Sequence, residues 1–237
     1  MLINQLKQKI VTFVRNQYGA LRNEYYAYTL RNKPKIFCIG RNKTGTTSLQ
    51  KAFSNLGYRV GNQRQAEIIS DKHVRYQRYE PLLDYCRSSQ VFQDVPFSHL
   101  ATLAHIDHAF PNSKFILSVR SSADEWYAST IRFHIKLFGI DNRLPTADEL
   151  KRARYIRRGD IYENIKRHYG TSDDDLYNKE KLTAHYNNHN QSVLNYFKDR
   201  PNDLLVINLS NKEAYQKMLD FLSITSSDTD FPWENKT

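Results

Sequence analysis

Apolar residues follow two patterns along this chain: short unbroken runs, and longer segments in which they recur every three or four positions. Runs at residues 35–39, 91–93, 114–119 and 204–208, and a shorter one at 58–60, are typical of buried strands. The three-to-four spacing predicts helices over residues 46–57, 63–88, 98–109, 122–138, 147–168, 178–198 and 211–222. Strands linked by helical crossovers form parallel sheets covered on both faces, so the pattern predicts an α/β fold: a three-layer αβα arrangement around a central parallel sheet of about five strands.

Residues 1–34 differ in character from the rest of the chain. From Ile3 to Tyr28, apolar side chains are spaced three or four apart, which predicts an amphipathic helix. Residues 1–35 hold seven Lys and Arg against the single acid Glu24, so they contribute +6 to the net charge of +10. We therefore divide the chain into a basic helical arm, residues 1–34, and one α/β domain, residues 35–237. The arm suits peripheral binding to an anionic membrane or self-association, and it equally suits packing on its own domain.

The remaining composition is that of a globular protein. With 237 residues, 40% of them hydrophobic, the chain can bury a full core. No apolar run is long enough to span a bilayer and no signal-peptide core follows Met1, so we expect a cytoplasmic protein that the arm can bring to a membrane. Basic and aromatic residues are not interleaved as in nucleic-acid binding proteins, so no nucleic-acid partner is expected. Cys38 and Cys86 form no zinc motif, the histidine pairs lack a third ligand, and no metal site is predicted.

The first strand of the domain runs into a loop suited to binding an anion. The loop precedes the helix expected from residue 46, whose first backbone N–H groups lack partners within the helix. Gly45 allows close backbone approach, Lys43 adds a positive charge, and hydroxyl donors come from Thr44, Thr46, Thr47 and Ser48. The plainer alternative is an ordinary strand-to-helix turn with a Ser or Thr cap.

Two kinds of phosphate loop are compatible with this segment. Gly40 and Gly45 have the spacing of a nucleotide-triphosphatase P-loop, but Thr46 stands where that motif has its lysine, which weighs against ATP chemistry with Mg²⁺. The segment Lys43-Thr44-Gly45-Thr46-Thr47 instead resembles the 5′-phosphosulfate loop of the sulfotransferases.

A second segment carries the same resemblance. The strand at 114–119 ends at Arg120, and Ser129 follows nine residues later, a gap one residue longer than is usual in that family. Weaker likeness continues through Trp126, the strand at 204–208 and the tail from Phe231 to Asn235. The chain is similar to the bacterial branch of the sulfotransferases over residues 35–237.

The resemblance implies a P-loop-like sulfotransferase architecture and a donor, 3′-phosphoadenosine 5′-phosphosulfate (PAPS). The activity it implies is sulfuryl transfer, without a metal, to an acceptor hydroxyl such as one on a glycan or a lipid-linked sugar. It places the donor on Arg41, Lys43, Thr44, Gly45, Thr46, Thr47, Ser48, Arg120 and Ser129, the last two at the 3′-phosphate. The alternatives are a P-loop nucleotide kinase or ATPase, and a non-catalytic nucleotide-binding module that has lost its base.

Sulfuryl transfer needs a base for the acceptor hydroxyl and a cation for the leaving oxygen. Lys43 is the expected cation. Asp94 is the first candidate base, because Gln93-Asp94-Val95-Pro96 resembles the segment with the catalytic His in cytosolic sulfotransferases; its alternative role is to cap the helix expected near Ser98. Glu67 is the second candidate, since related carbohydrate sulfotransferases use a Glu beyond the loop. His134 is either a contact of acceptor or cofactor or a packing residue.

Overall fold

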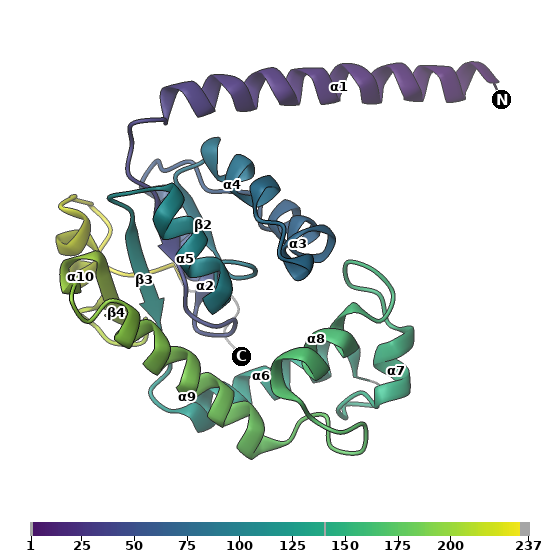
Figure 1. Ribbon diagram of the computed structural model, residues 1–237, viewed down its shortest axis with the longest axis vertical. Helices are drawn as coiled ribbons and strands as arrows, with labels where there is room; N and C mark the ends of the chain where they lie inside the picture. The colour runs from purple at the N-terminus through teal and green to yellow at the C-terminus, as the bar shows by residue number, and fades with distance from the viewer. Residues whose placement is uncertain (1, 140, 233–237) are drawn as a thin grey trace.

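The structure is a computed structural model and describes residues 2–139 and 141–232. Its centre is a parallel sheet of four strands in the order β2-β1-β3-β4, shown in Figure 1. The strands are β1 (Ile36–Cys38), β2 (Val91–Gln93), β3 (Lys114–Ser118) and β4 (Leu204–Ile207). The α/β class and the parallel sheet predicted from the sequence are confirmed.

Apolar side chains on both faces of the sheet explain why these runs form strands. On one face Phe37 lies in register with Phe92 and Phe115, with ring centroids 5.3 and 5.7 Å apart. On the other face, β1 turns Ile36 and Cys38 toward a second apolar cluster. Both cysteines of the chain, Cys38 and Cys86, are buried and free. A strand buried on both sides needs helices on both sides.

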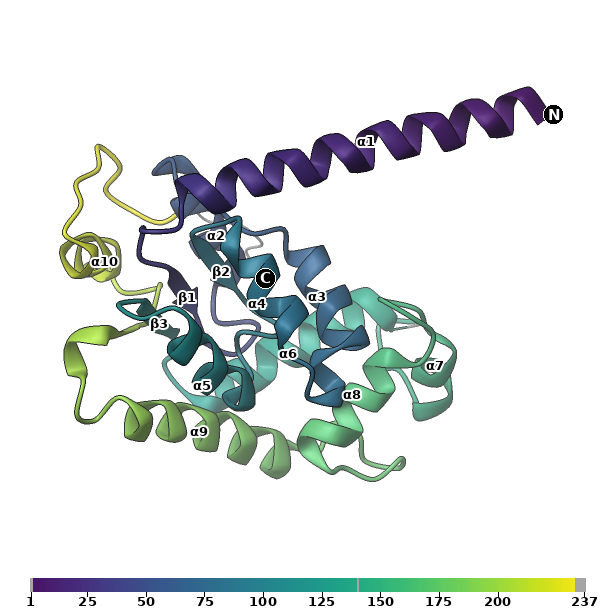
Figure 2. The ribbon, with the colours of Figure 1, turned by 45° about the horizontal axis from the view of Figure 1, so that its top comes forward.

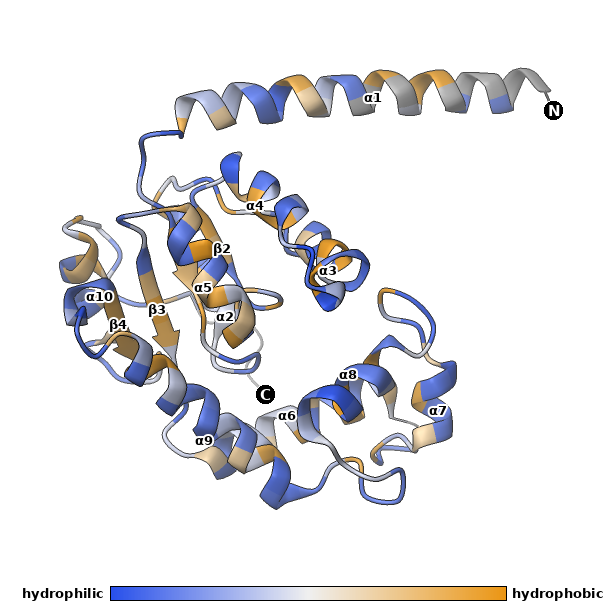
Figure 3. Cartoon of the chain, in the orientation of Figure 1, coloured by the Kyte–Doolittle hydropathy of each residue, from blue (hydrophilic) through white to orange (hydrophobic). Residues whose placement is uncertain are grey.

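Helices cover the two faces of the sheet as separate layers. The phenylalanine face packs against α3 (Gln63–Lys72), α4 (Glu80–Arg87), α5 (Leu100–Ala109) and α9 (Lys179–Tyr196). The opposite face packs against α2 (Thr46–Asn55) and α10 (Ala214–Leu222). The polar outer surfaces of these helices and the apolar strands between them are visible in Figure 3. The three-layer αβα arrangement is therefore confirmed.

A third apolar cluster lies beyond the carboxyl ends of the strands. It forms around the fully buried Trp126 and joins α6 (Ala123–Phe138), α7 (Ala147–Arg152) and α8 (Asp160–Tyr169) to the start of α9. In Figure 1 these helices stand below the sheet, where β3 points. Ligands of parallel sheets bind at this end of the strands, so the cluster forms one wall of the natural binding region.

Two predicted helices are each broken in the structure. The segment 63–88 divides into α3, a 3-10 turn over Val74–Tyr76, and α4, because Gln77 has a φ of 60° and Pro81 begins the next helix. The segment 147–168 divides into α7 and α8. Here the buried Asp160 carboxylate accepts the backbone N–H of Ile156 at 2.9 Å, which stabilises a turn in place of helix.

The expected strand at 58–60 is also wrong. Only Val60 pairs there, as an isolated parallel bridge to Val91, so the described sheet has four strands. Two helices also begin later than predicted: α5 begins at Leu100 instead of residue 98, and α10 begins at Ala214 instead of residue 211.

The predicted arm helix is present as α1 (Leu2–Thr29), and it extends away from the domain (Figures 1 and 2). Near its C-terminal end the Arg59 guanidinium lies 3.6 Å from the centre of the Tyr26 ring. Val11, Tyr18 and Leu21 are each at least 65% exposed, so this face does not pack on its own domain. Among the described helices none is long and apolar enough to cross a membrane. That the exposed face binds a membrane or a second copy stays a prediction.

Candidate active site

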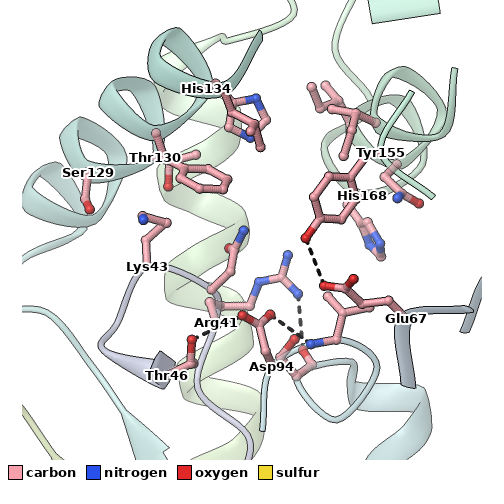
Figure 4. Close-up of a pocket in the computed structure, with 18 of the residues that line it drawn as sticks. Arg41, Lys43, Thr46, Glu67, Asp94, Ser129, Thr130, His134, Tyr155 and His168 are labelled. Atoms are coloured by element: carbon pink, nitrogen blue, oxygen red, sulfur yellow. Dashed lines mark hydrogen bonds between the residues drawn. The ribbon is translucent and has the colours of Figure 1, made fainter. Parts of the chain in front are cut away.

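A cavity of about 550 Å³ lies at the carboxyl ends of β1 and β2, between the loops that follow these strands and the helices α3, α6 and α8. Figure 4 shows the side chains that line it. The lining includes all but one of the site residues predicted from the sequence: Arg41, Lys43, Gly45, Thr46, Thr47, Ser48, Glu67, Asp94, Arg120 and Ser129. The exception is Thr44.

Thr44 supports the loop from behind. Its buried hydroxyl donates to the carbonyl of Arg41 at 2.6 Å and lies 2.7 Å from Ser118 Oγ on β3. Gly40 faces the same serine so closely that a Cβ on it would lie 2.3 Å from Ser118 Oγ. The loop therefore packs on β3 through small groups, and only a glycine fits at residue 40.

The backbone of the loop is tightly wound. Lys43 has a φ of 69° and Gly45 a φ of 96°, both in the left-handed region. A Cβ on Gly45 would lie 2.7 Å from Leu209 Cδ2. Gly45 is the N-cap of α2 and has no side chain to cap the helix, so the alternative of a Ser or Thr N-cap is wrong. An uncapped helix N-terminus that faces a cavity is a binding site for an anion.

Lys43 brings a positive charge to the same point. Its ammonium lies 4.1 Å from the centre of the Phe133 ring. Burial lowers the pKa of Lys43, and so do the positive charges of Arg120, Lys136 and Arg132, while Asp94 raises it. A cation–π contact contributes about 1 kcal/mol and a charged hydrogen bond to an anion about 1.5–3 kcal/mol, so an anion at the loop would draw Lys43 away from the ring.

Arg120 joins the loop to the end of β3. Its Nε donates to the carbonyl of Lys43 at 2.8 Å, and its Nη1 forms an ion pair with Glu125 at 3.1 Å. Its backbone N–H donates to the Tyr186 hydroxyl at 2.9 Å. Arg120 thus has a structural role in addition to any role in binding.

Ser129, nine residues later on α6, lies against the same cavity. The residue is only 1% exposed, and its hydroxyl has no hydrogen-bond partner in the described structure. The Ser129 hydroxyl is therefore available to donate to an acceptor in the cavity.

Asp94 directly follows β2 and faces the loop. Its Oδ2 accepts from the Thr46 hydroxyl at 3.1 Å and its Oδ1 from the Val95 N–H at 2.8 Å. Burial raises the pKa of Asp94, while these hydrogen bonds and the charges of Arg41 and Lys43 oppose the rise. No side chain caps α5, so the alternative that Asp94 caps this helix is wrong.

Glu67 enters the cavity from α3. It accepts hydrogen bonds from the Tyr155 hydroxyl at 3.1 Å and from Arg64 Nη1 at 3.3 Å. Burial raises the pKa of Glu67, whereas both hydrogen bonds lower it. Of the candidate bases, Asp94 thus lies beside the loop and Glu67 across from it (Figure 4), while Asp71 and Asp160 also line the cavity.

The family model for the sulfotransferase domain matches residues 35–237. The chain belongs to the sulfotransferases. The family inferred from the loop and from the Arg120 segment is thus confirmed. No curated protein matches the sequence of this sulfotransferase.

Several residues of the sulfotransferase site carry no sequence pattern that marks them. Tyr155 and Arg167 line the cavity, yet both lie in the segment predicted as one long helix. His99, the residue before α5, and His168 of α8 also line the cavity, and their ring centres lie 4.8 Å apart. Only the turn held by Asp160 brings Tyr155 to Glu67, and nothing in the local sequence predicts that turn.

His134 also borders the cavity of the sulfotransferase, but it is a packed residue. Its Nδ1 lies 2.9 Å from the Tyr177 hydroxyl, and burial lowers its pKa to about 4. Nowhere in residues 2–139 and 141–232 do three or more His, Cys, Asp or Glu side chains come together in a way that could hold a metal ion.

Proposed function

We propose that this sulfotransferase transfers the sulfuryl group of PAPS to an acceptor hydroxyl in the cavity described above. The observation that carries the proposal is the meeting, in one cavity, of the uncapped N-terminus of α2, the Lys43 ammonium and the Asp94 carboxylate. This combination supplies an anion site, a cation and a base within reach of one another.

The residues present fit such a donor. The loop and the first turn of α2, with Thr46 and Thr47, suit the 5′-phosphosulfate. The unpartnered Ser129 hydroxyl and the Arg120 guanidinium suit the 3′-phosphate, since a phosphate accepts hydrogen bonds from both. When bound, the donor supplies an activated sulfuryl group with a phosphate oxygen as its leaving group.

Each side chain then has one task. Asp94 accepts the proton of the acceptor hydroxyl as the new oxygen–sulfur bond forms. Lys43 turns from the Phe133 ring and stabilises the negative charge on the phosphate oxygen as the old sulfur–oxygen bond breaks. Thr46 donates a hydrogen bond to the Asp94 carboxylate, which fixes the base against the loop.

Asp94 is the better candidate base because it touches the loop directly, whereas Glu67 bonds Tyr155 and Arg64 on the far wall. Burial raises the pKa of both carboxyls, which strengthens each as a proton acceptor. Glu67 remains the second candidate.

The test is to follow PAPS conversion to 3′-phosphoadenosine 5′-phosphate (PAP) in EDTA, with a panel of hydroxyl acceptors and with ATP and Mg²⁺ as competitor. We expect acceptor-dependent conversion without a divalent metal, and PAP binding that ATP does not displace. Hydrolysis of ATP would favour a P-loop kinase or ATPase. Tight PAP binding without turnover on any acceptor would favour a non-catalytic nucleotide-binding module.

A further inference from the structure

Arg41 is a buried cation that forms no ion pair among the described residues, although its charge acts on the Asp94 carboxylate. The residue is 5% exposed, and its side chain makes one described hydrogen bond, from Nη1 to the Ser98 carbonyl at 3.2 Å. Its Nε is buried without any partner, and no described carboxylate forms an ion pair with it. Burying an unpaired charge is costly, so a structure that keeps one usually has an anion to bind.

The Arg41 side chain lies on the acceptor side of the cavity. In Figure 4 Lys43 extends toward α6, while the Arg41 guanidinium extends the other way, toward the side on which Glu67, Tyr155 and His168 lie. Although Arg41 belongs to the loop, its charge is directed away from the ammonium that faces the proposed leaving group. Asp94 lies within the influence of both cations.

Arg167 on α8 adds a second positive charge to that side. It lines the cavity, and its one described hydrogen bond runs from Nη2 to Asn164 Oδ1 at 2.6 Å. The nearby carboxylates are already in use, because Asp71 and Glu163 pair with Arg75 and Arg157. The Arg167 side chain is exposed and forms no described ion pair with these carboxylates, so its guanidinium is accessible to a ligand in the cavity.

The histidines around Arg41 do not cancel this charge. Burial, together with the charges of Arg41 and Arg167, lowers the pKa of His168 to about 3. The pKa of His99 is lowered for the same reasons, with His168 contributing. Both rings are neutral near pH 7, and a neutral imidazole still offers one N–H to an acceptor.

We infer that the acceptor of this sulfotransferase carries an anionic group, a carboxylate, sulfate or phosphate, that binds Arg41 and Arg167 while its hydroxyl lies at Asp94. This inference rests on the proposed function. In the proposed binding mode the donor's phosphates lie at the N-terminus of α2 and at Arg120 and Ser129, so we assign Arg41, which the family resemblance placed at the donor, to the acceptor. The ligand class is thus an acidic acceptor, such as a uronic-acid sugar, rather than a neutral one.

The test uses protein saturated with PAP, so that the donor site is filled. Two matched probes are titrated by calorimetry: 4-nitrophenyl β-D-glucuronide and 4-nitrophenyl β-D-glucoside, which differ in one carboxylate. Inorganic sulfate serves as a third probe that does not depend on sugar shape. We expect sulfate to bind the PAP complex, and the glucuronide to bind at least tenfold more tightly than the glucoside.

Variants assign that binding to the two arginines. Arg167→Met should weaken sulfate and glucuronide binding at least tenfold and leave PAP affinity unchanged; Arg41→Gln is the second variant, accepted only with an unchanged melting temperature. Arg158→Met removes an exposed arginine outside the cavity and should change nothing. Sulfate binding that is absent, or equal in wild type and Arg167→Met, overturns the inference, as does equal binding of the two sugars. If PAP itself does not bind, the proposed function is wrong, and this result is distinct from a failure of the acceptor inference alone.

Discussion

Substituting Lys43 tests whether its positive charge contributes to sulfuryl transfer or only to binding. We expect Lys43→Ala to lower turnover by on the order of 10²-fold or more and to weaken PAP binding less, because the ammonium matters most as the leaving oxygen becomes anionic. The measurements are kcat with PAPS and Kd for PAP. Lys51→Ala removes an exposed lysine of α2 outside the cavity and serves as the control. Equal losses in kcat and in PAP affinity would mean that Lys43 contributes only to binding in the ground state.

Arg120 and Ser129 test where the 3′-phosphate binds. Arg120→Ala should weaken PAP binding much more than binding of adenosine 5′-phosphosulfate, which lacks that phosphate. Some loss for both ligands is expected, because Arg120 also holds the Lys43 carbonyl. Ser129→Ala is the cleaner variant, since the Ser129 hydroxyl bonds nothing in the described structure. Calorimetry with both ligands decides: if Ser129→Ala changes neither affinity, the 3′-phosphate lies elsewhere.

The two carboxyls can be separated by matched amide variants. Asp94→Asn should abolish turnover and keep PAP binding nearly intact, while Glu67→Gln keeps substantial turnover. Burial raises the pKa of Asp94, so kcat/KM should fall as pH drops through a value above the ordinary pKa of about 4, because the base is then protonated. An active Asp94→Asn together with an inactive Glu67→Gln would transfer the role to Glu67.

The residues of the loop were the site residues that the sequence marked most directly, whereas Asp94, Glu67, Arg120 and Ser129 came from the family resemblance. Lys43, Gly45 and Thr46 belong to one loop, and a contiguous loop can be recognised from residue types alone. The direction of a side chain cannot be predicted in this way: Arg41 belongs to that loop, but its side chain turns toward Ser98. Tyr155 and Arg167 reach the cavity only through the packing of α8 and the turn before it.

At the level of elements, the apolar runs predicted the strands well. β2 matches its predicted range at both ends, and all three of its residues are buried: Val91 and Phe92 with apolar side chains and Gln93 with a polar one. The two long helical segments were wrong because helical spacing continues across a break. Gln77 and Asp160 interrupt the backbone there by local conformation and hydrogen bonding, which periodicity does not register.

The arm helix α1 carries a prediction of its own. Its exposed face holds Val11, Tyr18 and Leu21, and residues 1–35 contribute +6 to the net charge, so we expect it to lie on an anionic membrane surface. Sedimentation with anionic liposomes should pull down the full chain at low salt and release it at high salt, and a chain lacking residues 1–29 should stay in solution.

Two results would discard the membrane role of α1. One is the absence of salt-sensitive binding to anionic vesicles, with neutral vesicles as the control. The other is a concentration-dependent dimer that the same deletion abolishes, which would mean that a second copy covers the exposed face. The deletion is informative only if the remaining domain keeps its melting temperature.

Across the whole molecule, the parallel sheet explains why residues from distant segments share one cavity. The loops after β1, β2 and β3 carry Lys43, Asp94 and Arg120 to the same edge of the sheet, since all described strands run in one direction. The helices α6, α8 and α9 close that edge and hold the loop, as in the hydrogen bond from Trp126 Nε1 to the Asn42 carbonyl at 2.9 Å.

A crystal structure with PAP bound, grown without a divalent metal, tests the central claim most directly. We predict the 5′-phosphate at the N-terminus of α2 with the Lys43 ammonium turned from the Phe133 ring to meet it. The 3′-phosphate should contact Arg120 and the Ser129 hydroxyl, and Asp94 should face the position that the sulfuryl group would occupy. A nucleotide bound outside this cavity, or one whose 3′-phosphate contacts neither Arg120 nor Ser129, would contradict the account.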